Sequence, residues 1–141
     1  MKTLNFSDGR EEYRLNDKVS VRFNPTDVGF LEKLTETYER LDALQEELNS
    51  SRETLSEADI FPFARGQDAK MRSVLDELFD TPICDVLFGS LNLYASAGGF
   101  PVWANFMIAI TEEVESAMQG ELAAREQRIA KYTAKYRNEY Q

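Results

Sequence analysis

Carboxylates are the most abundant side chains in this sequence that could take part in chemistry, with 25 Asp and Glu residues in a chain of 141. Glu112 with Glu115, and Asp76 with Asp80, have spacings that place both acids on one face of a helix. Such pairs can serve in general acid–base catalysis or hold Mg²⁺. However, no Asp-x-Asp arrangement accompanies them. The pattern therefore favours solvated helix surfaces over a metal site.

Other chemically useful residues are scarce. Histidine is absent, which removes the commonest general base and the commonest metal ligand. Cys84 is alone, so it can form neither an intrachain disulfide nor an ordinary zinc site, and its apolar neighbours predict a buried, unreactive thiol. Gly98-Gly99 lacks the further glycine and the Lys-Ser/Thr of a nucleotide-binding loop. We therefore predict that the protein is not an enzyme and takes no cofactor.

The segment 121–141 is basic and rich in tyrosine, and it is the strongest candidate for a binding function. Three tyrosines recur every fourth residue, with an isoleucine on the same side of a helix and a basic stripe beside them. Tyrosine rings give binding area at low entropic cost, and charges give orientation. The alternative is a terminal helix whose tyrosines pack on its own core. The residues concerned are Arg128, Ile129, Lys131, Tyr132, Lys135, Tyr136 and Tyr140.

A second candidate binding element surrounds the glycine pair. Phe100 and Trp103 are large aromatic residues that follow Gly98-Gly99 and flank Pro101. They either anchor the next apolar helix in the core or form an exposed anchor for a protein partner.

The charge distribution restricts the class of partner. The net charge is −9; residues 121–141 contain five basic and three acidic residues, so residues 1–120 carry −11. This balance disfavours nucleic acid and anionic membranes, and it favours basic protein surfaces, including the tail of a neighbouring copy. The sequence has no signal-peptide layout and no apolar run near 18 residues, so we expect a cytoplasmic protein.

The elements that must position these residues predict a mainly α (α+β) fold in a single domain, 1–141. Alternating apolar residues predict a small antiparallel hairpin or three-stranded meander over 2–23. A helical core then spans 24–120, and a basic, tyrosine-rich tail helix spans 121–141. We expect four to five helices in the whole domain. Asn24 is expected to cap the first helix with Pro25 at its first position.

The boundaries of the later elements follow from composition. Residues 49–59 are polar and predict a loop, 64–79 a second helix, and Thr81-Pro82 a short helix that Gly89 ends. A flexible connection over 96–100 precedes an apolar helix, 102–118, and Gly120 is expected to break it from a tail helix. We predict that residues 1–120 fold without the tail.

The first helix raises the question of a coiled coil. Leu34, Leu41 and Leu48 repeat every seven residues, but four residues after each the sequence has Tyr38, Gln45 and Arg52. This favours an ordinary amphipathic bundle helix over a coiled coil, with an inward face formed by Leu31, Leu34, Tyr38, Leu41, Leu44 and Leu48.

Four segments, in this order, resemble a known family. They are Asn24-Pro-Thr-Asp27 before a Leu/Glu-rich helix, Asp80-Thr-Pro-Ile-Cys-Asp-Val-Leu-Phe-Gly89, Phe100-Pro-Val-Trp-Ala-Asn-Phe106 and Lys131-Tyr-Thr-Ala-Lys-Tyr136. The set resembles the small acidic tail-assembly-chaperone-like proteins of long-tailed phages and prophages of Gram-positive bacteria, from about residue 4 to residue 137.

This resemblance implies a non-enzymatic protein that binds the helical tape-measure protein, the tail-tube protein, or both, during virion assembly. The family supplies no catalytic motif, so no active-site residue is carried over. A structural tail component, such as a connector, and an acidic regulatory protein of the antitoxin type are the alternatives. Self-association is a further partner option.

Overall fold

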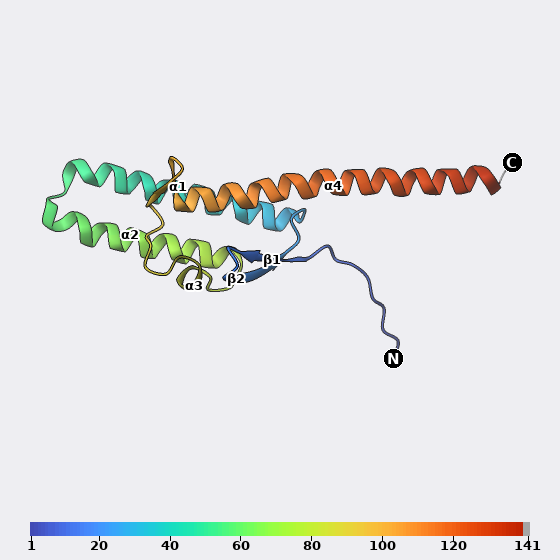
Figure 1. The fold of residues 1–141 in the computed structure, drawn as a ribbon, viewed down its shortest axis with the longest axis horizontal. Coiled ribbons are helices and arrows are strands. Elements are labelled where there is room, and N and C mark those ends of the chain that lie inside the picture. Colours follow the sequence, from blue (N-terminus) through green and yellow to red (C-terminus); the bar gives the residue numbers. More distant parts are fainter. Residues whose placement is uncertain (140–141) are drawn as a thin grey trace.

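An antiparallel hairpin is the first regular element of the computed structural model, which describes residues 1–139 and side-chain surroundings as far as residue 135 (Figure 1). Strands β1 (Glu11–Leu15) and β2 (Val19–Phe23) pair with Tyr13 opposite Val21. Asn16 and Asp17 both have positive φ, as a type I′ turn requires. The apolar face of the hairpin packs on the core through Val21 and Phe23.

The hairpin interpretation is confirmed, and the meander is wrong. Residues 1–10 form no strand, and the side chains of Leu4 and Phe6 are exposed. Asn24 Nδ2 donates to the carbonyl of Asp8, which fixes the start of the hairpin. The preceding residues extend past the helices (Figure 1), so Leu4 and Phe6 have no apolar surface to cover them.

Helix α1 (Val28–Thr54) begins later than expected. Asp27 is its N-cap and accepts a hydrogen bond from the amide of Gly29. Asn24 instead accepts from the amide of Thr26 at 2.8 Å, so Pro25 lies in a turn before the helix. Asn24 and Asp27 both have a side-chain oxygen that can cap a helix, and Asp27, the one nearer the apolar residues, caps α1.

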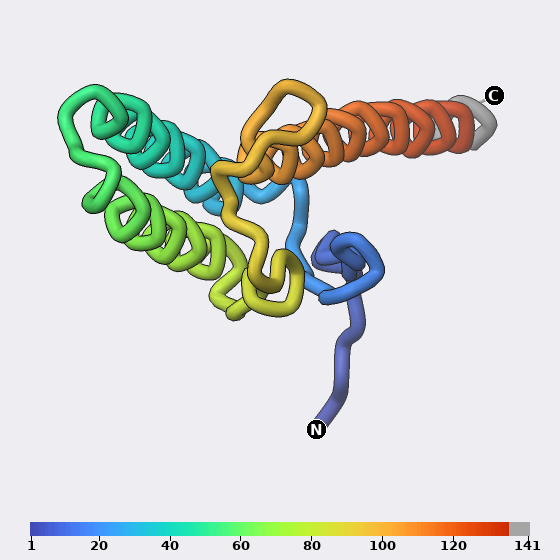
Figure 2. Tube along the Cα trace, turned by 60° about the vertical axis from the view of Figure 1, so that its left-hand side comes forward, coloured from blue at the N-terminus to red at the C-terminus, as the bar shows by residue number. Residues whose placement is uncertain are grey.

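Helices α1 and α2 (Glu57–Leu78) form an antiparallel pair joined by two residues, Leu55 and Ser56 (Figures 1 and 2). The predicted loop over 49–59 is wrong, because Leu48 and Ser51 are buried between the two helices. Many buried positions alternate by three and four residues, as at a coiled-coil seam. They include Phe30, Leu34, Thr37, Leu41, Leu48 and Ser51 on α1, and Ala64, Gln67, Met71, Val74 and Leu78 on α2. In the leucine repeat of α1, the residues that complete the buried seam therefore follow each leucine by three positions, as Thr37 and Ser51 do, and not by four.

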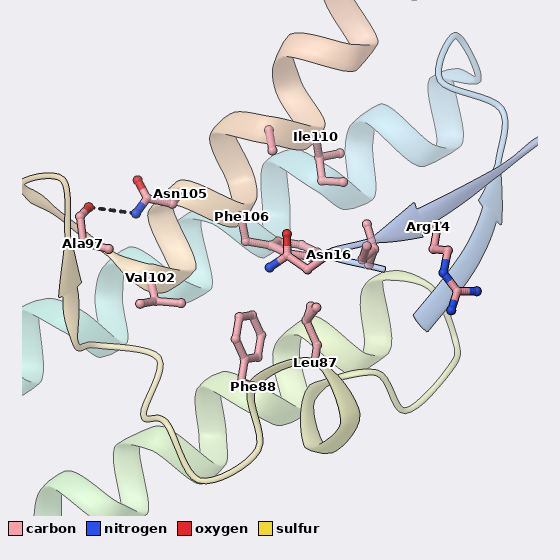
Figure 3. Close-up of a pocket in the computed structure, with 11 residues that line it drawn as sticks. Arg14, Asn16, Leu87, Phe88, Ala97, Val102, Asn105, Phe106 and Ile110 are labelled. Atoms are coloured by element: carbon pink, nitrogen blue, oxygen red, sulfur yellow. Dashed lines mark hydrogen bonds between the residues drawn. The ribbon is translucent and has the colours of Figure 1, made fainter. Parts of the chain in front are cut away.

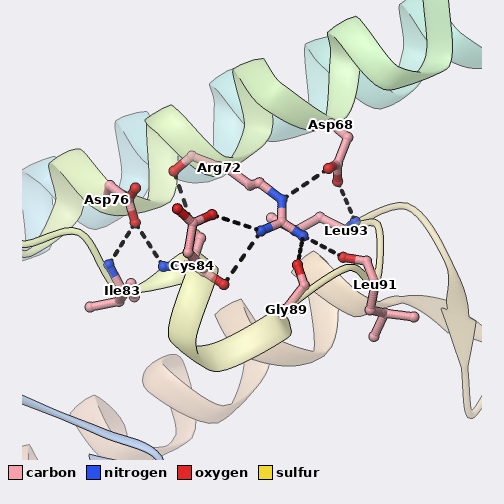
Figure 4. A network of polar contacts seen from close by, with 9 residues as sticks. Asp68, Arg72, Asp76, Ile83, Cys84, Gly89, Leu91 and Leu93 are labelled. Atoms are coloured by element: carbon pink, nitrogen blue, oxygen red, sulfur yellow. Dashed lines mark hydrogen bonds and ion pairs between the residues drawn. The ribbon is translucent and has the colours of Figure 1, made fainter. Parts of the chain in front are cut away.

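A partly buried arginine organises the irregular segment that follows α2 (Figure 4). The Arg72 side chain, 15% exposed, donates to Asp68 at 2.9 Å and to the carbonyls of Gly89 and Leu91 at 2.7 and 2.6 Å. Asp68 in turn accepts from the amide of Leu93 at 2.7 Å.

Asp76 completes this network by binding the start of the next helix. It accepts from the amides of Ile83 and Cys84 at 2.8 and 3.0 Å, at the beginning of α3 (Cys84–Phe88). Gly89 ends that helix with φ of 56°, as predicted. Asp76 is therefore part of the fold, contrary to the expectation of a solvated acid.

The glycine pair forms a tight turn and not a flexible connection. Gly98 and Gly99 have φ of 62° and 90° and join strands β3 (Ser96–Ala97) and β4 (Phe100–Pro101). Glycine adopts these angles without the steric penalty that a side chain would bring.

Helix α4 (Val102–Glu139) runs without interruption through Gly120, so the predicted break is wrong. A single glycine costs a helix only about 1 kcal/mol, and strong helix formers surround it. A methyl group at Gly120 would meet no atom. Figure 2 shows the second half of α4 leaving the rest of the molecule. None of the helices in residues 1–139 has the length and apolar character needed to cross a membrane.

An aromatic cluster joins the hairpin to the helices. Phe23 stacks between Tyr13 and Phe30, with ring centroids 4.5 and 4.4 Å apart. Phe79 then contacts Phe106 of α4, with centroids at 6.2 Å. These contacts connect the hairpin, the end of α2 and the first half of α4 in one core.

We expect Arg72→Ala to lower the free energy of unfolding by about 1–3 kcal/mol, because Asp68 and the two carbonyls lose their common donor. Arg40→Ala is the matched control, since it breaks an exposed pair with Glu77. That variant should cost less than about 1 kcal/mol. Urea unfolding of both variants measures the difference, and equal losses would contradict a special role for Arg72.

The Cys84 thiol is fully buried, and this burial, together with a hydrogen bond involving Asp76, raises its pKa. The folded chain therefore keeps a proton that the unfolded chain releases above about pH 8.5. The stability that Cys84 contributes is complete below that pH and is lost as the pH rises. We expect the thermal midpoint to fall between about pH 8.5 and 10, and less so in Cys84→Ala.

Thiol labelling checks the same point. The native protein should react slowly at neutral pH, and a Ser96→Cys variant on the Cys84→Ala background, with its thiol in the exposed strand β3, should react at once. Fast labelling of native Cys84 would contradict the buried, protonated thiol.

Candidate protein-binding surface

The first half of α4 is anchored in the core. The amides of Val102 and Trp103 donate to the carbonyls of Ala95 and Leu93 at 2.8 and 3.0 Å, which fixes where the helix starts. Trp103, Met107, Ile110 and Val114 then lie buried on one face of the helix. This apolar face was predicted from the sequence and is confirmed.

The same face continues into the second half of α4, where nothing covers it. At about 100° per residue, the apolar residues beyond Val114 project on the side of Met107. Among the described side chains they are exposed by 37 to 75%, and they form what we call the distal stripe: Met118, Leu122, Ile129 and Tyr132. Ile129 and Tyr132, the predicted binding residues, therefore do not pack on the core of their own chain.

Basic residues border the distal stripe. Arg128, Lys131 and Lys135 are exposed, as predicted, and Arg125 lies within the stripe itself. Tyr136 lies in α4, but its side chain is outside the described residues, as is Tyr140 altogether. The described part of this surface thus combines apolar area with positive charge.

The two aromatic residues near the glycine turn have different environments. Trp103 is only 3% exposed, and its indole Nε1 donates to Gln45 Oε1 at 3.0 Å. It anchors α4 on α1, so its prediction as an exposed binding residue is wrong for this state of the protein. Phe100 is exposed and remains available to a partner.

Phe100 lies at one end of a groove between α1 and α4, which we call the α1–α4 groove. Its volume is about 430 Å³ at this end, with a floor that includes Trp103 and Met107. A second hollow continues it toward Val114 and shares Tyr38, Met107, Thr111 and Glu115 with it. Its acidic lining residues are Asp42, Glu112 and Glu115.

The groove was not among the features predicted from the sequence. Tyr38 was expected to point inward, but it is half exposed and its ring lies 6.0 Å from that of Trp103. The buried seam of α1 uses Thr37, three residues after Leu34, where Tyr38, four residues after it, was expected. Tyr38 therefore lies beside the α1–α2 seam and not in it.

A separate cavity of about 410 Å³ lies between the hairpin turn, α3 and α4 (Figure 3). Phe88, Val102 and Phe106 line it, together with Asn105, which donates to the carbonyl of Ala97. Arg14, at its edge, donates to the carbonyl of Asp17. None of the lining residues is an acid, a histidine or a cysteine.

The predicted carboxylate pairs do not assemble a reactive site in the described residues. No group of three or more His, Cys, Asp or Glu side chains there is placed to hold a metal ion. Glu113, beside the Glu112–Glu115 pair, accepts a hydrogen bond from the Tyr13 hydroxyl at 3.0 Å. Burial, followed by this hydrogen bond, raises the pKa of Tyr13.

Comparisons with known proteins add no relative. No family model, no curated protein and no solved structure matches the chain.

We expect residues 1–120 to fold without the rest of α4, because the distal stripe contributes nothing to the core of its own chain. The truncated protein should unfold in one cooperative transition and keep the near-ultraviolet dichroism of Trp103. A molten truncated protein would show that residues 121–141 are part of the core. Ultraviolet circular dichroism and thermal unfolding measure both properties.

Proposed function

We propose that the protein is a non-enzymatic binding protein that holds a helical segment of another protein on the distal stripe. The observation that carries this proposal is the apolar face of α4, which continues past the core and is exposed at Leu122, Ile129 and Tyr132. Contiguous exposed apolar surface with a charged border is typical of protein interaction sites.

The spacing of the stripe favours a helical client. Met118, Leu122, Arg125, Ile129 and Tyr132 follow one another at intervals of four and three residues. Two helices pack along such a seam when both have this repeat. The basic border, with Lys131 and Lys135, favours a client helix with acidic flanks.

The resemblance to tail-assembly-chaperone-like proteins supplies a specific client. The tape-measure protein of a long-tailed phage is expected to be long and helical, so it would offer many segments of this kind, and the tail-tube protein is the second candidate. In this proposal the protein acts in the host cytoplasm during assembly and covers apolar helical surface until the tube forms.

A structural role in the tail is the second candidate, and the N-terminal arm favours it. Leu4 and Phe6 alternate with polar residues, are exposed, and directly precede β1. An extended arm of this kind can add as a strand to the sheet of a neighbouring subunit. Mass spectrometry of purified particles separates the two roles, since a structural subunit is present in stoichiometric amounts and a chaperone is not.

We expect the double variant Ile129→Ala/Tyr132→Ala to weaken binding to the tape-measure or tube protein by more than about 2 kcal/mol, because central aromatic and aliphatic anchors carry most of the binding energy. Titration against the proteins encoded beside its gene measures this. Gln127→Ala, on the opposite side of α4, is the matched control and should bind like the unchanged protein.

Charge reversal tests the basic border. Lys131→Glu/Lys135→Glu should lower mainly the association rate, with a smaller effect at high salt. Thermal unfolding runs in parallel. If the Ile129/Tyr132 variant loses stability and keeps its binding, the stripe serves packing and the proposed function is wrong.

A further inference from the structure

The α1–α4 groove and the distal half of α4 are complementary in charge, and both offer apolar surface. The groove has an apolar floor and three acids, Asp42, Glu112 and Glu115, with no basic residue in its lining. Glu112 and Glu115 form no ion pair within the described part of the chain. The distal half of α4 offers an apolar stripe with basic residues, in a segment, 121–141, that is net basic.

The distal stripe cannot reach the groove of its own chain. Groove residue Glu115 and stripe residue Ile129 lie on the same uninterrupted helix, about 21 Å apart at 1.5 Å per residue. A straight helix cannot fold back on itself, so a groove can be filled only by the stripe of another molecule.

We propose that two copies of this chain form an antiparallel dimer in which the distal stripe of each copy lies in the α1–α4 groove of the other. Thr111 and Glu115 in the groove project within about 40° of Leu122 and Ile129 around the helix axis. One face of α4 therefore carries both halves of the contact. Two-fold symmetry then satisfies both grooves and both stripes together.

The register of the dimer follows from the exposed apolar residues. Exposed Ile108 in the groove and Ile129 in the stripe face each other when the two α4 helices run antiparallel. By symmetry the same register brings Arg125 level with Glu112 of the second copy along the helix axis. The two side chains project about 140° apart around α4, so they border the contact on opposite sides and do not form a direct pair.

The dimer goes beyond the proposed function but uses the same stripe, so client and second copy compete for it. Self-association is measured without any client. Failure of the dimer would leave client binding untouched, and loss of client binding with an intact dimer would refute only the proposed function.

The test is sedimentation equilibrium of the full chain at low salt, with charge reversals in the groove and in the stripe. Glu112→Lys alone and Arg125→Glu alone should each weaken self-association by about twofold to fivefold, because each replaces an attraction between the acidic groove and the basic stripe by a repulsion. The double variant Glu112→Lys/Arg125→Glu should recover the affinity. Glu53→Lys, an exposed acid at the far end of α1, changes the net charge as much as either single reversal and should have no effect.

Three outcomes would overturn the proposal. One is an unchanged protein that stays monomeric up to its highest soluble concentration. Another is a dimer that neither single reversal weakens. The third is a double variant that fails to recover, which would exclude a charge attraction between the groove and the stripe. Both positions are exposed, and near-ultraviolet dichroism confirms that each variant is folded.

Discussion

The hydrogen bonding of the Arg72 guanidinium is the interaction on which the rest of the structure depends. Residues 79–101 contain one five-residue helix and two strands of two residues, so their backbone groups have few regular partners. Arg72, Asp68 and Asp76 supply those partners from one side of α2 (Figure 4). A charge that is partly withdrawn from water needs hydrogen-bond acceptors, and here Asp68 and the loop carbonyls provide them. The segment in turn fixes the start of α4 through Leu93 and Ala95.

The position of α4 creates both candidate surfaces. Trp103 holds the helix on α1 through Gln45, and the spacing of the two helices leaves the groove beside Tyr38. The helix then continues from Val114 to Glu139, and its apolar face keeps the same orientation as far as Tyr132. An apolar face that only served the core would end where the core ends. Its continuation through Ile129 and Tyr132 is the observation behind the proposed partner.

Features that depend on local pattern could be predicted from the sequence. The alternation around Asn16-Asp17 predicted the hairpin, and the spacing of Met107, Ile110 and Val114 predicted the core face of α4. Choices between two adequate local signals failed: Asn24 and Asp27 are both good caps, and a lone glycine at position 120 does not decide whether a helix stops. At Asn24 a hydrogen bond from the amide of Thr26 decided the case, and at Gly120 the strong helix formers on either side did.

The remaining errors concern contacts between residues distant in sequence. The polar residues 49–54 are helical because Leu48 and Ser51 pack against α2, and no pattern within that segment shows this. Trp103 could equally have been an anchor in the core or on the surface until its partner, Gln45, was located 58 residues away. The acids of the groove come from two helices, so their convergence is invisible in either one.

The division of charge within the chain gives the two proposed contacts different roles. A groove with three acids and a stripe bordered by Arg125, Arg128 and Lys131 attract each other between identical molecules, yet these charges are exposed and screened by salt. Exposed ion pairs of this kind orient two surfaces and contribute little affinity. The apolar contact must therefore supply most of the stability of either complex. A client helix that offers a longer apolar seam than the groove can displace the second copy without any change in α4, so the dimer would protect the stripe until a better partner is present.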